Sequence, residues 1–376
     1  MKVTIVIAIS ILLITSLYGQ EYPGVFQCRQ DSKVPLFFNQ FDPIEIELTT
    51  DYNKINDPSL YPEDAKSTLS SGKLKYYNQL DGINLDIEVK VRARGGYRFE
   101  ECDYRPLKVI ISKQEKKRIK KRSPNNIFRK MGRKLKFTTI CSQQDQTKAE
   151  RTLFKELYIY KLLGLFNSTT LKVRLVKLTM KLPDGSNYLT SYAFIRETPK
   201  RVAQRCNLQL EPQIYIGWDN ELRKSYQFTF DQNRQKIPFI HQSAPGSRFQ
   251  AELYNQFIYN NDYSFLMRHN IINLLAPGNL IYHLTYDYDL GFVVDGGIYN
   301  TSNDNGESAP AFTQWITEYS ASEQIKKEHL SPFVDQRNNM LEMISRSSLL
   351  DNKGKQEMLT WLTSYLAVID NYLSHK

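Results

Sequence analysis

The sequence predicts an α+β protein in which a strand-rich part is followed by a helix-rich part. In the first part, residues 44–48 and 85–92 alternate apolar and polar side chains with the period of two that is typical of β-strands. In the second part, residues 250–259, 330–344 and 355–373 have the apolar spacing of amphipathic helices. The chain has 376 residues, of which 41% are hydrophobic, so it is long enough to form two lobes.

The first 19 residues have the pattern of a cleavable secretory signal. Lys2 supplies a positive start, residues 3–17 are almost all apolar, and Gly19 offers a small residue at the cleavage point. The apolar run is shorter than the roughly 20 residues of a membrane-spanning helix, and the alternative is an uncleaved N-terminal anchor. We therefore expect a secreted or periplasmic protein with no transmembrane segment in the mature chain.

A change of period divides the mature chain into two lobes. Residues 107–111 and 135–140 continue the strand pattern, and residues 153–165 then have the spacing of a helix. We place the boundary at this change. Residues 20–145 are expected to form a strand-rich N-terminal lobe, and residues 146–376 a C-terminal lobe that is mixed at first and then helical.

The net charge of +10 is concentrated in one segment. Residues 113–136 contain twelve Lys or Arg and one acidic residue, Glu115, so this segment carries +11 and leaves −1 for the rest of the chain. We predict that residues 113–134 form an exposed basic loop, which is either a solvated insertion or a contact to an anionic membrane or glycan surface. Aromatic residues are not interleaved through the segment, so we expect no nucleic-acid partner.

Four cysteines form an even set in a chain that we expect to be exported. Two disulfides are therefore predicted, and four cysteines allow three pairings. Cys102 and Cys141 lie beside strands that we expect to be neighbours across the basic loop, so we pair them. Cys28 and Cys206 remain for the second bridge.

The second half of the chain carries a series of acidic and amide side chains in loops. Asp262 follows a helix, Asn270 precedes a strand, and Asp287 and Asp289 follow the next strand. Kinase-type sites place a catalytic base and two magnesium ligands in this order, because a carboxylate orients the acceptor hydroxyl while oxygen ligands hold Mg²⁺ against the phosphates. The same residue types also form ordinary turns. The sequence has no Gly-x-Ser-x-Gly, His-Glu-x-x-His or Cys-x-x-Cys motif.

Several short segments, in the same order along the chain, resemble the motifs of the spore-coat protein H (CotH) kinase family. Residues 91–98 (VRARGGYR) resemble the family's Arg-Gly-Asn-x-Arg turn, and residues 102–108 (CDYRPLK) its Cys-x-(Phe/Tyr)-Pro-Pro-Leu-(Arg/Lys) strand. Residues 134–141 (KLKFTTIC) are similar to its Lys-Leu-Lys-Leu-Val-Thr-His-Cys strand, and residues 156–162 (ELYIYKL) to its Glu-Tyr-Leu-Ala-Tyr-Arg-Leu helix. The loop residues Asn260 to Ser264, His269-Asn270 and residues 286–289 complete the series. The resemblance extends over nearly the whole mature chain and is closest to the exported bacterial branch.

The resemblance implies an atypical protein-kinase-like fold of two lobes. It also implies Mg²⁺-dependent phosphoryl transfer from ATP, or another nucleotide, to a hydroxyl of a protein or envelope-associated acceptor. The implied roles are a phosphate-holding lysine paired to a helix carboxylate, a turn over the nucleotide phosphates, a catalytic aspartate and a set of metal ligands. In that order the residues are Lys136 with Glu156 (or Lys108 in place of Lys136), Arg94 and Gly95, Asp262, and Asn270 with Asp287 and Asp289. We expect these side chains to converge on one cleft.

The chain departs from the family pattern at several points. Gly96 stands where the family usually has Asn, and Tyr263 replaces the commoner Trp. The basic segment before Lys136 is also longer than usual. These differences leave open a second interpretation, in which the protein is a catalytically inactive binding or surface-assembly module. A third is a structural envelope protein tethered by its basic loop.

Overall fold

A computed structural model describes most of the chain from residue 28 onward. The described residues are 28, 34, 36–38, 42–57, 59, 67–94, 102–128, 131–142, 144–211, 215–219, 224–230, 236–238, 242–260, 263, 265, 270–276, 280–288, 294 and 308–375. The predicted signal segment, residues 1–19, therefore lies outside the described residues. No described helix has the length and hydropathy that are needed to cross a membrane.

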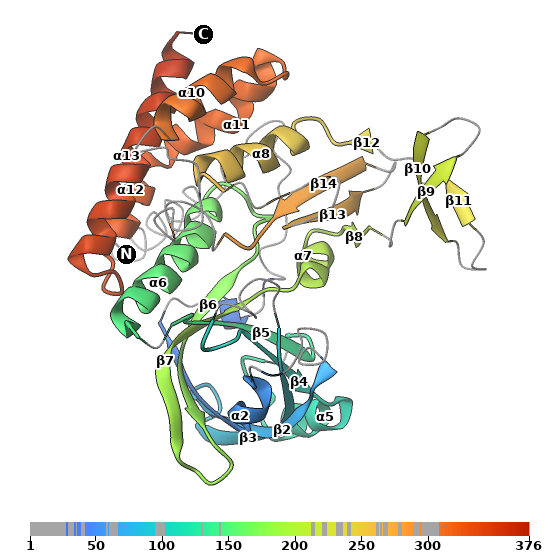
Figure 1. The fold of residues 1–376 in the computed structure, drawn as a ribbon, viewed down its shortest axis with the longest axis vertical. Coiled ribbons are helices and arrows are strands. Elements are labelled where there is room, and N and C mark those ends of the chain that lie inside the picture. The colour runs from blue at the N-terminus through green and yellow to red at the C-terminus, as the bar shows by residue number, and fades with distance from the viewer. Residues whose placement is uncertain are drawn as a thin grey trace, which may run out of the picture.

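Seven strands close into a β-barrel in the order β1-β2-β3-β4-β5-β7-β6. Their bounds are β1 Ile44–Thr50, β2 Ser70–Asn78, β3 Ile83–Ala93, β4 Leu107–Ile111, β5 Lys134–Thr139, β6 Val173–Lys181 and β7 Asn187–Arg196. Neighbouring strands are antiparallel except β1 and β6, whose parallel pairing (Ile44 opposite Val176) closes the barrel. The barrel forms the lower part of Figure 1.

The predicted protein-kinase-like two-lobe fold is therefore wrong, because a closed barrel is not the sheet of a kinase N-lobe. The strand pattern itself is correct, and the error concerns how the strands pair. In β3 the alternate residues Leu85, Ile87 and Val89 are buried inside the barrel, while their neighbours Asp86 and Glu88 are exposed. This alternation identifies a strand with one buried face, but an open sheet and a closed barrel produce the same alternation.

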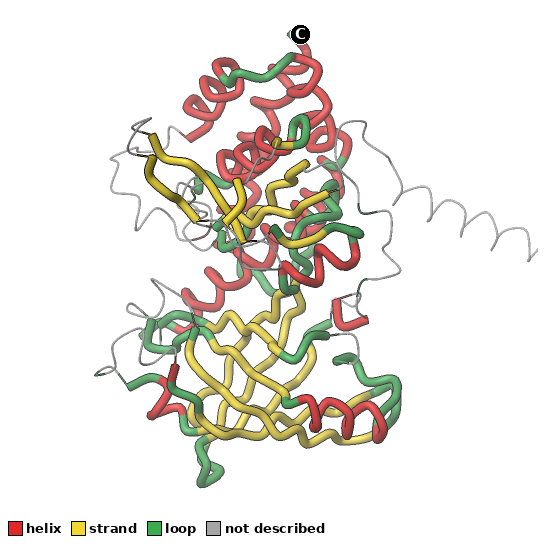
Figure 2. Tube along the Cα trace, turned by 90° about the vertical axis from the view of Figure 1, so that its right-hand side faces the viewer, coloured by secondary structure: helices red, strands yellow, loops and turns green. Residues whose placement is uncertain are grey.

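The second part of the molecule covers one end of the barrel (Figures 1 and 2). Helix α6 (Gln146–Leu163) packs against β6 and β7 on one side and against the C-terminal helix α13 (Asn352–Ser374) on the other. Phe257 lies at the centre of an aromatic core with Phe333, Trp361 and Tyr365, at ring-centroid distances of 4.6, 4.8 and 5.6 Å. The predicted helix over residues 330–344 is divided between α11 (Glu323–Asp335) and α12 (Arg337–Ser345).

The remaining elements are short helices, a four-stranded sheet in the order β12-β14-β13-β8, and a three-stranded sheet in the order β11-β10-β9. The helices are η2 Leu36–Phe38, α2 Tyr52–Ile55, α5 Lys113–Arg122, α7 Pro199–Arg205, α8 Ser247–Phe257 and α10 Ser308–Glu318. The strands are β8 Gln209–Leu210, β9 Tyr215–Asp219, β10 Lys224–Phe230, β11 Lys236–Pro238, β12 Gln242–Ser243, β13 Ile271–Ala276 and β14 Leu280–Thr285.

The first ten residues of the predicted basic loop form helix α5 instead. The Ser112 hydroxyl caps this helix by accepting a hydrogen bond from the Glu115 backbone N–H at 2.9 Å. Ile119 is buried against the barrel, and the Glu115 carboxylate pairs with Arg118. A serine followed three residues later by a glutamate is a helix-start signal. This signal and the single buried apolar residue outweigh the repulsion among the basic side chains.

Both disulfides form the predicted pairs. Cys102 is bonded to Cys141 and Cys28 to Cys206, with a Cα–Cα distance of 4.5 Å in each bridge. The first bridge joins the segments that precede β4 and follow β5, which are hydrogen-bonded neighbours in the barrel. The second bridge joins the chain ahead of β1 to the residue that ends α7.

Candidate functional site

A row of basic side chains crosses four neighbouring strands of the barrel. Arg92 lies opposite Lys108, Lys108 opposite Lys136, and Lys136 opposite Arg196, on β3, β4, β5 and β7. Residues that are directly opposite on paired strands project from the same face of a sheet. The neighbours of these residues along each strand, such as Phe137, point into the barrel and are buried. The four cations therefore share the outer face, near the end of the barrel that the second part of the molecule covers.

A cleft of about 870 Å³ opens between this face of the barrel, helix α5 and helix α7. Its size is within the usual range of ligand sites. The described residues that line it include no Asp or Glu, and eight of them are basic: Lys108, Lys116, Arg133, Lys134, Lys136, Lys200, Arg201 and Arg205. Such a lining favours an anionic occupant.

Lys136 is the most strongly perturbed cation of the cleft. Burial, followed by the nearby Arg196, Arg94 and Lys108, lowers the pKa of its ammonium group to about 7, and Asp287 opposes the shift. The neighbouring Lys108 also has a lowered pKa, first because of burial and then because of other cations. A lysine in this position loses hydration and is repelled by like charges. A bound anion would relieve both effects.

Arg196 is a buried arginine that links the row of cations to the second part of the molecule. Its side chain is 4% exposed, and its guanidinium donates to the Asp287 carboxylate at 2.9 Å. Burial lowers the pKa of Arg196, but Asp287, Tyr160 and Glu156 outweigh this effect and the net pKa is raised. The Asp287 backbone N–H donates to the Tyr160 hydroxyl at 2.9 Å, which fixes the carboxylate relative to α6.

Asn270 and Asp287 lie side by side at the open end of one β-hairpin, before β13 and after β14. The β13–β14 ladder ends where Ile271 lies opposite Thr285, and the next backbone hydrogen bond runs from the Tyr286 N–H to the Asn270 carbonyl at 3.1 Å. Asn270 has φ 53° and Asp287 has φ 63°. Asn and Asp adopt this left-handed conformation more readily than other residues with a Cβ atom, and here it turns the chain at the end of the ladder. The Tyr286 ring lies 5.1 Å from the Arg196 guanidinium carbon.

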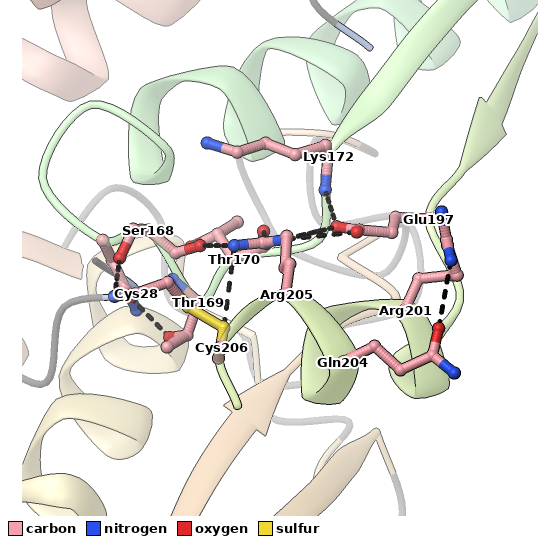
Figure 3. Close-up of polar contacts among 11 residues, drawn as sticks. Cys28, Ser168, Thr169, Thr170, Lys172, Glu197, Arg201, Gln204, Arg205 and Cys206 are labelled. Carbon is pink, nitrogen blue, oxygen red and sulfur yellow. Dashed lines mark hydrogen bonds and ion pairs between the residues drawn. A yellow bond between two sulfur atoms is a disulfide. The ribbon is translucent and has the colours of Figure 1, made fainter. Parts of the chain in front are cut away.

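Helix α7, which forms one wall of the cleft, is anchored by a buried ion pair (Figure 3). Arg205 donates to both oxygens of the Glu197 carboxylate, from Nε at 3.1 Å to Oε1 and from Nη2 at 3.1 Å to Oε2. Arg205 also donates to the Thr170 carbonyl at 2.9 Å. The disulfide between Cys206 and Cys28 lies at the end of the same helix. These contacts fix the helix that carries Lys200 and Arg201.

The structure brings together six of the nine residues that the sequence indicated. Arg94, Lys108, Lys136 and Asp287 act on one another electrostatically. Glu156 lies beside Arg196, and Asn270 lies on the hairpin that carries Asp287. The other three, Gly95, Asp262 and Asp289, lie outside the described residues.

Sequence reasoning missed Arg196, whose pKa is raised by two of the predicted acids, Asp287 and Glu156. It ends an apolar run, residues 193–195, and this position carries no motif. Only the pairing of β5 with β7 places it beside Lys136. The cations of α7 were missed for the same reason, because α7 approaches the barrel only in the folded chain.

The described residues alone do not fit a magnesium site. Among them, no group of three or more His, Cys, Asp or Glu side chains lies close enough together to hold a metal ion. The Asp287 carboxylate accepts from Arg196 and faces a surface of cations, which repels a divalent cation. A metal at this place would need ligands from outside the described residues.

Comparison with protein-family models, with curated proteins and with solved structures finds no match. The resemblance to the spore-coat protein H kinases therefore stays a prediction.

Proposed function

We propose that the protein binds a phosphorylated ligand in the cleft between the barrel and helix α7. Seven of the eight basic residues of the lining can offer N–H donors to a ligand, whereas Arg205 is already paired with the buried Glu197. Lysine and arginine are the side chains that hold phosphate groups, as point charges and as paired donors respectively.

The environment of Lys136 is the main support for this proposal. A half-buried ammonium group beside Arg196, Arg94 and Lys108 destabilises the folded protein, and stability alone would favour an apolar residue there. Residues that reduce stability in this way are concentrated at functional sites. A phosphate in contact with Lys136 and Lys108 would neutralise the repulsion.

The proposed location is outside the cytoplasm, secreted or periplasmic. The two disulfides support it, since disulfides persist mainly in oxidising compartments. The remaining cations of residues 113–134 support contact with an anionic surface. Lys117, Lys120 and Lys121 of α5 are exposed and do not line the cleft.

The test is calorimetric titration of the protein with inorganic phosphate, pyrophosphate and ATP. We expect Lys136→Met to weaken binding about 10- to 100-fold, which corresponds to the loss of one charge-assisted hydrogen bond. Lys73→Met is the matched control, because Lys73 is an exposed lysine on the outer face of the same barrel and lies away from the cleft. Equal affinities for the wild type and Lys136→Met would exclude the cleft as the binding site.

A second function, phosphoryl transfer from ATP or another nucleotide to a protein or envelope-associated hydroxyl, is supported by the position of Asp287. The charge of its carboxylate acts on the pKa of Lys136, so a phosphate held by the lysine would be close to an acid. Labelled ATP with Mg²⁺ or Mn²⁺ tests this function in the purified protein, with Asp262→Asn as the variant of the implied catalytic residue. Binding of ATP without any transfer of label would support the inactive binding module.

A further inference from the structure

The cleft has a second group of cations at its outer end, separate from the row on the barrel. This group consists of Lys116 on α5, Arg133 directly before β5 and Arg201 on α7. Burial, and then the charges of Arg201 and Arg133, lower the pKa of Lys116, so both arginines lie near this lysine. None of them belongs to the motifs that resemble a known family.

Both groups of cations line the same cleft, but different charges act on their lysines. Arg196, Arg94 and Lys108 lower the pKa of Lys136, whereas Arg201 and Arg133 lower the pKa of Lys116. Arg133 precedes Lys136 by three residues, and a strand rises about 3.3 Å per residue, so their backbones are about 10 Å apart. Lys134 lies between them and also lines the cleft. The inner group (Lys108, Lys136) and the outer group (Lys116, Arg133, Arg201) therefore present two centres of positive charge.

Two members of the outer group, Lys116 and Arg201, have hydrogen-bond partners within the protein. The Lys116 ammonium donates to the Met131 carbonyl, which leaves two of its three protons for a ligand. The Arg201 guanidinium donates to the Gln204 side-chain oxygen at 3.0 Å, as Figure 3 shows. Helix α7 itself is fixed by the buried pair of Arg205 and Glu197, which are 2% and 0% exposed. Binding to fixed donors orders few side chains, which favours affinity.

We propose, on the basis of the phosphate-binding function above, that the ligand carries at least two separated phosphate groups. One group contacts Lys136 and Lys108, and the other contacts Lys116, Arg133 and Arg201. A ligand with a single phosphate fills only the inner part of the cleft. The outer group thus sets the preference for polyphosphorylated molecules.

The experiment compares inorganic phosphate with tripolyphosphate in calorimetric titrations of the full mature chain. For Arg201→Gln we expect the affinity for tripolyphosphate to fall about tenfold or more, while the affinity for inorganic phosphate changes less than about twofold. For Lys136→Met we expect both affinities to fall. Arg122→Gln, an exposed arginine on α5 that does not line the cleft, is the control and should change neither.

The outcomes separate this inference from the function on which it rests. If the wild type binds neither probe, the phosphate-binding function itself fails. If the wild type binds both probes equally well, or if Arg201→Gln weakens both by the same factor, the function stands and the second subsite is wrong. A Lys116→Gln variant repeats the test on α5, and its thermal unfolding is compared with that of Lys120→Gln to separate a folding defect from a loss of binding.

Discussion

Lys136 should make the stability of the protein depend on pH in the alkaline range. Its pKa is about 7 in the folded state, against an ordinary value of 10.5, because it is buried beside other cations. The folded protein thus releases this proton at a lower pH than the unfolded chain does. The charged ammonium group therefore lowers the free energy of unfolding. This effect is fully present below pH 7 and disappears as the pH rises from 7 to 10.5.

The magnitude follows from the difference between the two pKa values. The difference between a pKa of 10.5 and one of about 7 corresponds to about 5 kcal/mol below pH 7, at about 1.4 kcal/mol for each tenfold change in the proton-binding constant. At pH 9 the remaining difference from 10.5 is about 1.5, which corresponds to about 2 kcal/mol. Lys136→Met removes the titrating group and keeps much of the aliphatic stem. We therefore expect the stabilising effect of the substitution to be about 3 kcal/mol larger at pH 6 than at pH 9.

Urea denaturation of the wild type and the variant at both pH values measures this difference. Lys73→Met serves as the control, because Lys73 is an exposed lysine of the barrel. If the free energies of unfolding of the wild type and Lys136→Met change in parallel between pH 6 and pH 9, Lys136 is not a buried titrating group and the reasoning fails. Saturating tripolyphosphate should abolish the difference, because a bound anion restores the high pKa of the lysine.

Three further predictions concern residues outside the row of cations on the barrel. His329 is 4% exposed, and burial lowers its pKa to about 4. Because the unfolded chain binds this proton already near pH 6.5, the free energy of unfolding should fall by about 3 kcal/mol between pH 6.5 and 4. In urea denaturation, His329→Leu should remove this part of the pH dependence. Gly246→Ala should lower the melting temperature by several degrees, because a Cβ atom there would lie 2.2 Å from the His329 ring and the backbone has φ 70°; an unchanged melting temperature would contradict the contact. Arg205→Met should cost about 3–5 kcal/mol in urea denaturation, because it leaves Glu197 buried without its partner, whereas a cost below about 1 kcal/mol would show that the pair is not buried in solution.

Strands β1, β3, β4 and β5 of the barrel could be predicted because their signal is local. Residues 107–111 were expected as a strand and form β4 with the same bounds, and β1, β3 and β5 differ from the predicted ranges by two residues or fewer at each end. The closure of the barrel could not be predicted. It depends on parallel pairing of Ile44 with Val176, and no periodicity within either segment specifies that partner.

The same distinction applies to the site. The short motifs predict Lys136 and Asp287 as site residues, and in the structure the charge of Asp287 opposes the lowering of the Lys136 pKa. Arg196 and Arg201 carry no motif and become neighbours of the cleft only through the closure of the barrel and the anchoring of α7. The charge of the basic segment predicts a solvated loop, but Ser112 and Glu115 form a cap that starts α5. This cap is a local signal that the sequence contains and that outweighs the charge.

The cation row and the register of the barrel strands depend on each other. Moving β5 by one residue would turn Lys136 into the barrel and bring Phe137 to the outer face. The buried Phe137 and Leu135 therefore hold Lys136 outward, although this position places it against Lys108 and Arg196. Burial of the apolar side chains stabilises the barrel, and repulsion among the cations at one end of its outer face lowers this stability. A barrel with alternating charges on this face would be more stable, so the concentration of charge is better explained by an anionic ligand than by the fold.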